Sequence, residues 1–232
     1  MRKFCISTLL LSVAFLSIKA QHNNSKDAVT PNQHNGYEFV DLGLSVMWAN
    51  CNIGAKKPED FGYFFAWGET RYKSHYNWFT YRFGDWCEIT KYCSQTICGK
   101  DGFVDNKNVL ELSDDAANVA WGGDWRIPTI MEFKELMDNC DWKWYSDNGL
   151  YGYKITSRIN GNSIFLPASG YCSDTKVYLI GSEGRYWSSS LSLDDSSSAY
   201  RLYFSSESVD CLNSYYDRCL GQTIRPVYKL TQ

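Results

Sequence analysis

The segment Trp121-Gly-Gly-Asp-Trp-Arg-Ile-Pro-Thr-Ile-Met-Glu132 separates two predicted helices and shows where the second begins. Pro128 argues against an earlier start, because the residue before a proline avoids the helical conformation. Thr129 and Glu132 have the spacing of a capping box, in which each side chain accepts a hydrogen bond from the backbone N–H of the other residue. The sequence therefore predicts a helix from this point. Its apolar face carries Phe133, Leu136 and Met137.

The other helix is predicted just before this segment, in Ser113-Asp-Asp-Ala-Ala-Asn-Val-Ala120. Ser113 is a favourable N-cap residue, and the two carboxylates that follow it lie at the positive end of the helix dipole. We therefore interpret the pair Asp114-Asp115 as a helix start, and not as the two acids of a glycoside hydrolase.

Eight segments rich in β-branched and aromatic residues are separated by turn-forming residues, such as Asn35-Gly36 and Asn160-Gly161-Asn162. We expect these segments to be strands, at residues 37–42, 45–50, 63–67, 153–156, 163–167, 186–189, 199–204 and 223–228. Within 199–204, alternation places Tyr200, Leu202 and Phe204 on one face. Two helices and many short strands predict an α+β protein with more loop than regular structure.

The composition is that of a globular protein, with 44% hydrophobic and 21% charged residues in a chain of 232. These values exclude collagen, coiled coils and wholesale disorder. Aromatic residues reach 16%, which favours strands and binding surfaces over a helix bundle. The formal net charge of −3 and the lack of a Lys/Arg cluster argue against nucleic acid, or an anionic membrane surface, as a partner.

The first twenty residues have the pattern of a secretory signal peptide: two basic residues, an apolar stretch over 6–18, and Ala20 at the expected cleavage site. We expect residues 21–35 to be a flexible tether and residues 36–232 to be a single domain. No later segment is long and apolar enough to span a membrane. The mature protein is thus expected to be exported, to the periplasm, the outer surface or the extracellular space.

The mature chain carries eight cysteines, an even number in a compartment that is expected to be oxidising. Disulfides are the leading interpretation. The sequence does not choose their pairing, although Cys93 with Cys98 and Cys211 with Cys219 would each close a short loop. Zinc is the alternative, but no CxxC pair is present. The eight are Cys51, Cys87, Cys93, Cys98, Cys140, Cys172, Cys211 and Cys219.

A set of motifs occurs in order along nearly the whole mature chain. They are Gly36-Tyr-Glu-Phe-Val-Asp-Leu-Gly-Leu44, Trp48-Ala-Asn-Cys-Asn-Ile-Gly-Ala55, Phe64-Phe-Ala-Trp-Gly-Glu-Thr70, Asp114-Asp-Ala-Ala117, Trp121-Gly-Gly-Asp-Trp-Arg-Ile-Pro-Thr129, Tyr186-Trp-Ser-Ser-Ser190 and Ile224-Arg-Pro-Val227. Together they resemble the Fibrobacter succinogenes major paralogous domain, which is common in exported proteins of gut and rumen Bacteroidota. Part of the set is also similar to the sulfatase-modifying, formylglycine-generating proteins.

This resemblance implies a C-type-lectin-like fold. In such a fold two helices flank short, twisted antiparallel sheets with extensive loops, the chain ends lie close together, and a long loop region lies on one side. Several motif residues are then expected to be structural. We expect Arg126 and Arg225, each near a proline, to make buried hydrogen bonds to backbone carbonyls or carboxylates. Burial is also expected for Trp67, Trp121, Trp125 and Trp187.

An enzyme is the least supported class of function. His75 is the only histidine within 36–232, and no recognisable nucleophile motif lies beside it. The surroundings of Cys211 and Cys219 do not match the motif of the formylglycine-generating proteins. The tripeptides Glu-Pro-Asn, Gln-Pro-Asp and Trp-Asn-Asp, through which many C-type lectins bind calcium, do not occur. We therefore expect a non-enzymatic protein without a cofactor or metal.

The stretch 188–219 concentrates Ser, Tyr, Asp and Asn, a mixture typical of recognition surfaces. Exposed Tyr also suits a polysaccharide, because sugar faces stack on aromatic rings. We therefore predict a binding module for an extracellular glycan or protein. Two alternatives stay open: the serines only fill solvent-facing positions, or the protein is a structural envelope component without a small-molecule ligand. The predicted contact residues are Tyr200, Tyr203, Tyr215, Tyr216, Asp217 and Arg218.

Overall fold

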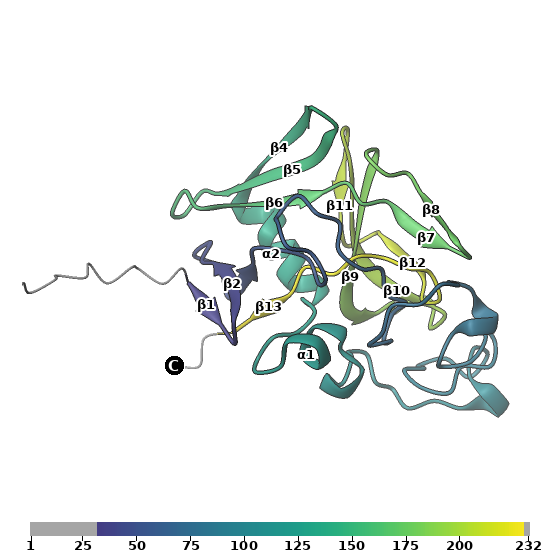
Figure 1. Ribbon diagram of the computed structural model, residues 1–232. Helices are drawn as coiled ribbons and strands as arrows, with labels where there is room; N and C mark the ends of the chain where they lie inside the picture. The colour runs from purple at the N-terminus through teal and green to yellow at the C-terminus, as the bar shows by residue number, and fades with distance from the viewer. Residues whose placement is uncertain (1–31, 230–232) are drawn as a thin grey trace, which may run out of the picture. The chain divides into compact units, whose positions relative to one another are not determined.

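The computed structural model describes residues 32–229. Short strands alternate with two α-helices and with long irregular segments, the longest of which runs between β3 and α1 (Figure 1). The α-helices are α1 (Ala116–Trp121) and α2 (Ile130–Asn139), and 3-10 turns occupy Trp78–Thr80, Lys100–Gly102 and Leu112–Asp114. The α+β class is confirmed, because a sheet-rich set of antiparallel strands is combined with the two helices.

One sheet joins the two ends of the described chain. Its strands, antiparallel and in this order, are β1 (Gln33–His34), β2 (Tyr37–Val40), β3 (Met47–Ala49) and β13 (Val227–Tyr228). The His34 ring stacks on the Tyr228 ring with a centroid distance of 4.2 Å. The indole N–H of Trp125 donates to the His34 carbonyl at 2.8 Å. The beginning and the end of the described residues therefore lie side by side (Figure 1).

The last residues of the predicted tether belong to the folded domain. Residues 33–34 form β1, and the side chain of Asn35 donates to the backbone carbonyl of Trp121. A two-residue strand of polar side chains carries no hydrophobic pattern, so its sequence is not distinguished from that of a linker. The expected signal peptide and residues 21–31 lie outside the described residues.

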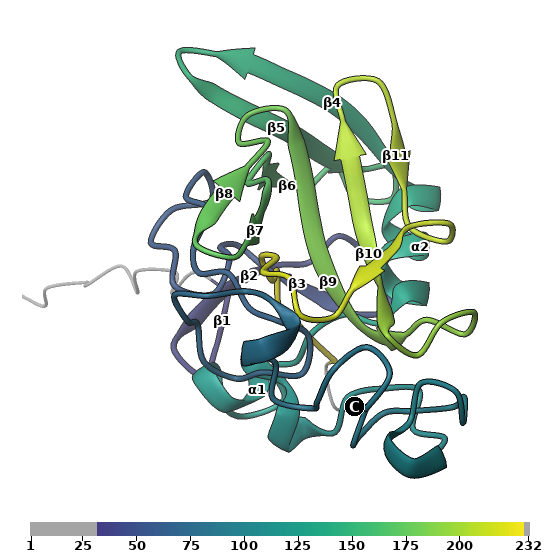
Figure 2. The same cartoon turned by 90° about the vertical axis from the view of Figure 1, so that its right-hand side faces the viewer.

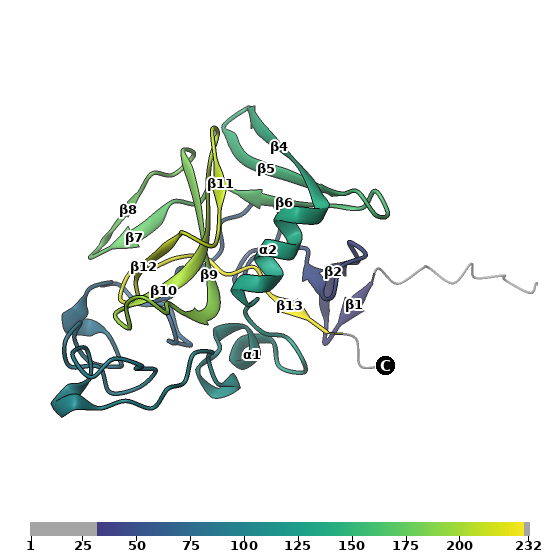
Figure 3. The same cartoon turned by 180° about the vertical axis from the view of Figure 1, so that it is seen from behind.

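The central sheet is built on one long strand, β10, which pairs with β9 along one edge and with β11 and β12 along the other. The strands are β9 (Glu183–Leu191), β10 (Ser198–Ser205), β11 (Val209–Asp210) and β12 (Tyr215–Asp217). Helix α2 lies against one face of this sheet (Figure 3), where its Phe133 packs in a buried cluster with Leu202 and Phe204. The segments that follow β3 and β6 lie on the other face of this sheet.

A three-stranded sheet and a hairpin complete the described strands. The sheet contains β4 (Cys140–Asp147), β5 (Leu150–Ser157) and β6 (Ser163–Pro167), and the hairpin contains β7 (Tyr171–Ser173) and β8 (Lys176–Tyr178). The hairpin stands beside β9 on the side away from α2 (Figure 2).

The strand predictions fail in both directions: one expected strand is absent, and six strands were not expected, namely β1, β4, β7, β8, β11 and β12. Residues 63–67 were expected to form a strand, but among them only Phe65 makes a single bridge, to Gln222. Conversely β4 was not predicted, although Trp142 and Trp144 alternate with polar residues along it and face a buried cluster.

The two helices begin where acidic or hydroxyl side chains cap them. The capping box of α2 is confirmed, with Thr129 and Glu132 each accepting from the other's backbone N–H. The start of α1 differs from the prediction, since the cap is Asp115 and not Ser113. The Asp115 carboxylate accepts from the backbone N–H of Ala117 at 2.9 Å and of Ile127 at 2.8 Å, and therefore ties α1 to the strand-like segment before α2. No helix among residues 32–229 is long and apolar enough to cross a membrane.

The buried tryptophans form the second cluster of the core. Trp67, Trp125 and Trp187 are at most 1% exposed and Trp121 is 7% exposed, so their expected burial is confirmed. The indole N–H of Trp67 donates to the Ser188 carbonyl and that of Trp187 donates to the Phe65 carbonyl, both at 2.8 Å. These two bonds fasten the irregular segment after β3 onto β9.

Asp115 gives the folding free energy a dependence on pH. Burial raises the pKa of Asp115 to about 6 from 3.8, against the lowering effect of its backbone hydrogen bonds. The folded chain therefore takes up this proton at a higher pH than the unfolded chain, and stability rises as pH falls from about 7 to about 5, by about 1 kcal/mol. Urea titrations at these two pH values measure the change.

The Asp115→Asn variant should be less stable and should lose this rise. Asp114→Asn is the matched control. Hydrogen bonds from Lys91 and Tyr92 outweigh burial and lower the pKa of Asp114, so its stabilising contribution is lost only at pH values below the ordinary aspartate range. A rise between about pH 7 and 5 that persists in Asp115→Asn would contradict this assignment.

Candidate ligand-binding site

Tyrosine rings and guanidinium groups alternate in one continuous stack on the face of the central sheet opposite α2. We call this set the tyrosine–arginine stack; its members, in spatial order, are Tyr178, Tyr171, Arg185, Tyr216, Arg201 and Tyr203. The Tyr178 and Tyr171 rings are 5.6 Å apart, and the Arg185 Cζ lies 3.9 Å from the Tyr171 centroid and 5.0 Å from that of Tyr216. The Arg201 Cζ lies 4.3 Å from the Tyr216 centroid and 5.6 Å from that of Tyr203.

The register of the central sheet places these side chains together. Tyr203 of β10 is directly opposite Arg185 of β9, and Arg201 is opposite Trp187. Residues that are directly opposite in an antiparallel pair project on the same face, so both arginines share a face with the buried Trp187. The segment after β3 covers the Trp187 end of that face. At the arginine end the β7–β8 hairpin lies beside β9 (Figure 2), and its Tyr171 ring lies 3.9 Å from the Arg185 Cζ. Tyr216 of β12 lies against both arginines.

The two arginines differ in their counter-charge. The carboxylate of Glu183 accepts from Nε and Nη2 of Arg185, each at 2.8 Å. Arg201 has no carboxylate partner among the described residues, and its Nε donates to the Ser214 hydroxyl at 3.0 Å. Both side chains are only 7% exposed, and Nη1 of each is buried without a hydrogen-bond partner. Burial, and next the neighbouring Arg185, lower the pKa of Arg201 to about 10.

This arrangement combines two kinds of contact. The half-buried rings of Tyr171, Tyr203 and Tyr216 and the exposed ring of Tyr178 offer apolar area at low entropic cost. The guanidinium of Arg201 offers charged N–H donors, and no carboxylate among the described residues is bonded to it. Such a surface can bind a ligand by stacking and by charge-assisted hydrogen bonds.

The structure divides the predicted contact residues into three groups. Tyr203 and Tyr216 belong to the stack. Tyr200 and Tyr215 instead pair edge to face with each other, with centroids 6.2 Å apart, and the exposed Asp217 follows on the same strand as Tyr215. Because side chains alternate along a strand, Tyr215 points to the opposite face from Tyr216.

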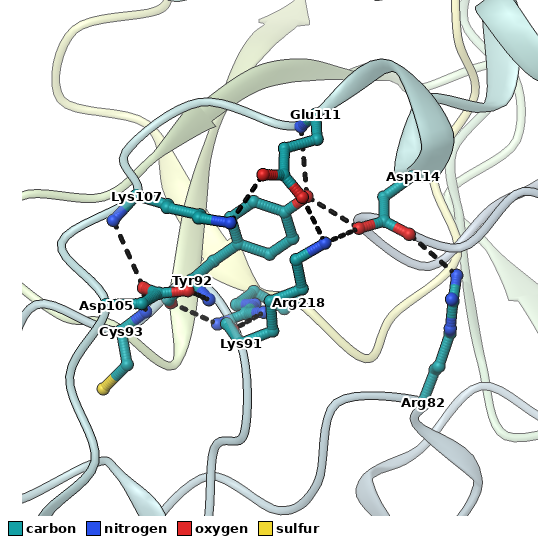
Figure 4. A network of polar contacts seen from close by, with 9 residues as sticks. All are labelled: Arg82, Lys91, Tyr92, Cys93, Asp105, Lys107, Glu111, Asp114 and Arg218. Atoms are coloured by element: carbon teal, nitrogen blue, oxygen red, sulfur yellow. Dashed lines mark hydrogen bonds and ion pairs between the residues drawn. The ribbon is translucent and has the colours of Figure 1, made fainter.

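Arg218 is the third group, and its prediction as a contact residue is wrong. It is fully buried, with Nη1 donating to the Tyr92 and Ser196 carbonyls and Nη2 to the Lys91 carbonyl, all at 2.9 Å. Figure 4 shows it beneath Lys91, whose ammonium group bridges Glu111 and Asp114 at 2.5 Å each. Arg218 therefore holds the irregular segment after β3 in place.

The serine-rich stretch is also interior. Both earlier interpretations, a recognition surface and solvent-facing filling, placed these hydroxyl groups in water, but most of them are buried and bonded to the chain. Ser188 donates to the Tyr200 carbonyl at 2.8 Å, and Ser197 donates to the Asp195 carboxylate at 2.7 Å. The buried serines are Ser188, Ser189, Ser190, Ser192, Ser196, Ser197 and Ser198.

Four of the six members of the stack were not among the predicted contact residues. Arg201 lies within the stretch 188–219, on β10, but was not selected. Tyr171, Tyr178 and Arg185 come from β7, β8 and β9, outside or at the edge of the stretch that was singled out for its composition. The available signal was the alternation Arg185-Tyr-Trp187 beside Arg201-Leu-Tyr203, which places both arginines on one face once the two strands are paired.

A second aromatic surface lies at the other end of the hairpin. Tyr63 and Tyr72 are exposed and stack with centroids 4.3 Å apart. With Lys73 and Val177 they line a pocket of about 440 Å³. Unlike the stack, this pocket contains no buried polar group without a partner among the described residues.

The groups considered for catalysis or metal binding lie apart from the stack. His75 is exposed, and its ring accepts or donates only to the neighbouring Ser74 hydroxyl, at 2.9 Å, among the described contacts. No group of three or more His, Cys, Asp or Glu side chains within residues 32–229 is arranged to hold a metal ion. All eight cysteines of this region are thiols in the structure. Cys211 and Cys219 lie in different core clusters, so nothing favours their pairing.

Comparison of the chain with protein-family models, curated proteins and solved structures finds no match.

Arg218→Lys is expected to lower the unfolding free energy by about 3 kcal/mol or more, because a lysine leaves buried carbonyl groups unpaired. The loss should be accompanied by faster amide exchange in residues 82–111, measured by hydrogen exchange. Arg82→Gln removes an ion pair from the same network, but the Arg82 side chain is 54% exposed, so its cost should stay under about 1 kcal/mol. Equal effects of the two variants would contradict the assignment.

The two arginines of the stack should respond oppositely to removal. Arg185→Gln leaves the carboxylate of Glu183 unpaired and should destabilise the chain by about 2 kcal/mol. Arg201→Gln removes an uncompensated buried charge and should leave the unfolding free energy within about 1 kcal/mol of the parent value, or raise it. Chemical denaturation of both variants at neutral pH provides the measurement.

Proposed function

We propose that this chain is an exported, non-enzymatic binding module that recognises an extracellular glycan through the tyrosine–arginine stack. The observation that carries the proposal is Arg201. It is nine-tenths buried, has no carboxylate partner among the described residues, and is flanked on both sides by tyrosine rings. A guanidinium without a counter-charge costs folding free energy, and a bound ligand that accepts its hydrogen bonds recovers that cost.

The extent of the stack favours a polysaccharide over a small ligand. The stack draws on β7, β8, β9, β10 and β12 and has accessible tyrosine rings at both ends, Tyr178 and Tyr203. Successive sugar units of an extended chain can each stack on a ring while their hydroxyl groups accept or donate hydrogen bonds.

We further propose that the fold is C-type-lectin-like. Three features support this: the adjacent chain ends at His34 and Tyr228, two helices beside antiparallel sheets, and the long irregular region between β3 and α1. Export is supported by the pattern of the first twenty residues. The motif set that resembles the Fibrobacter succinogenes major paralogous domain supports both.

A glycan array with plant, host and bacterial polysaccharides tests the proposal. The purified protein should bind a specific subset, and Tyr216→Ala should weaken that binding at least about tenfold, since a stacking ring contributes about 1–3 kcal/mol. Tyr215→Ala is the matched control, because it removes the neighbouring ring on the opposite face of β12.

The pattern of losses locates the surface. Loss of binding in Tyr215→Ala and not in Tyr216→Ala would move the site to the Tyr200–Tyr215 pair. Loss in Tyr72→Ala alone would move it to the pocket beside the hairpin. Absence of binding to every glycan, with a folded sample, would refute glycan recognition and favour the structural envelope role.

A further inference from the structure

We propose that the tyrosine–arginine stack selects acidic glycans, with the guanidinium of Arg201 receiving the carboxylate of a uronic acid unit. This inference rests on the function proposed above and specifies its ligand class.

The charge balance of the stack leaves one positive charge for a ligand. Glu183 is already bound to Arg185 through two hydrogen bonds of 2.8 Å. The hydroxyl of Tyr203 lies 3.4 Å from the other oxygen of Glu183, and Ser214 contributes an uncharged hydroxyl to Arg201. Among the described residues no carboxylate forms an ion pair with Arg201, so an anion that reaches its guanidinium supplies a counter-charge.

The guanidinium of Arg201 is also held in a fixed orientation. Its Nε donates to the Ser214 hydroxyl, and its Cζ lies 4.3 Å from the Tyr216 centroid and 5.6 Å from the Tyr203 centroid. A guanidinium presents parallel N–H donors in one plane, and these can form two hydrogen bonds to the planar carboxylate of a sugar acid. The hydroxyl groups of a neutral sugar do not offer two acceptors in this geometry. The neighbouring rings then stack on the faces of the sugar that carries the carboxylate.

The rest of the chain does not attract polyanions. Its formal net charge is −3, so long-range attraction cannot account for binding of an acidic polymer. Selectivity for the acid must then come from local contacts. We expect it to survive moderate salt, because a buried charge is screened less than an exposed one.

The experiment compares one polymer in two charge states. Affinity electrophoresis or calorimetry is carried out with polygalacturonate and with its fully methyl-esterified form, which has the same backbone without the carboxylate charge. The acid should bind at least about tenfold more tightly than the ester, as expected for a charge-assisted hydrogen bond. Arg201→Gln should reduce the affinity for the acid to that for the ester.

The controls separate charge, shape and folding. Arg158→Gln removes one positive charge at a distant turn, where the Arg158 side chain is 49% exposed, and should leave the preference unchanged. Arg201→Lys keeps the charge but loses the planar fork, and should retain only part of the preference. If Arg201→Gln does not fold, galacturonic acid and its methyl ester are compared as thermal stabilisers of the parent protein, and only the acid should raise the Tm.

The outcomes distinguish this inference from the proposed function. Equal binding of acid and ester, abolished by Tyr216→Ala, overturns the acidic preference and leaves glycan recognition intact. Binding to dextran sulfate without binding to polygalacturonate, alginate or hyaluronan also overturns the carboxylate assignment. Binding to no acidic, esterified or neutral polymer overturns both.

Discussion

Arg225 donates to backbone carbonyls of three separate segments, and it thereby joins the two sheets that these segments belong to or border. It is fully buried and donates to the carbonyls of Ala49 at 3.2 Å and of Asn50 and Phe165 at 2.9 Å. A chain with so much irregular backbone must bury carbonyl groups, and each needs a donor. Arg225 supplies several donors at once, joining the end of β3, the segment after it and β6. Its expected role is thereby confirmed.

The same solution recurs wherever the long segment after β3 meets the sheets. Arg218 donates to a carbonyl of this segment, that of Tyr92, and to that of Ser196 in the loop between β9 and β10. The indoles of Trp67 and Trp187 each donate one further hydrogen bond between the segment and β9. In each case a large side chain fills volume and donates hydrogen bonds together, which accounts for the aromatic-rich composition. The two arginines of the stack depart from this pattern, because Nη1 of each is left without a partner, and Arg201 also lacks a paired carboxylate among the described residues.

The sequence correctly predicted those structural features that depend on interactions between residues close together in the chain. The capping box at Thr129 and the strand at 163–167 need only neighbouring residues, and both agree with the structure. Arg218 and the buried serines were placed on the surface because composition alone cannot distinguish a polar residue that contacts water from one that contacts a distant carbonyl. The stack could not be predicted either, since it requires the pairing of β9 with β10 and the position of the hairpin.

The uncompensated charge of Arg201 is hard to explain by packing alone. A stack that only docked the β7–β8 hairpin onto the sheet would be served as well by an apolar side chain at this position, without the cost of burying a guanidinium. Arg185 shows that the chain can supply a carboxylate where the charge is structural, through Glu183 two residues away on the same strand. Buried polar groups that lack a hydrogen-bond or charge partner tend to occur at functional sites. The contrast between two adjacent arginines, one paired with a carboxylate and one not, therefore supports the proposal that Arg185 belongs to the scaffold and Arg201 contacts the ligand.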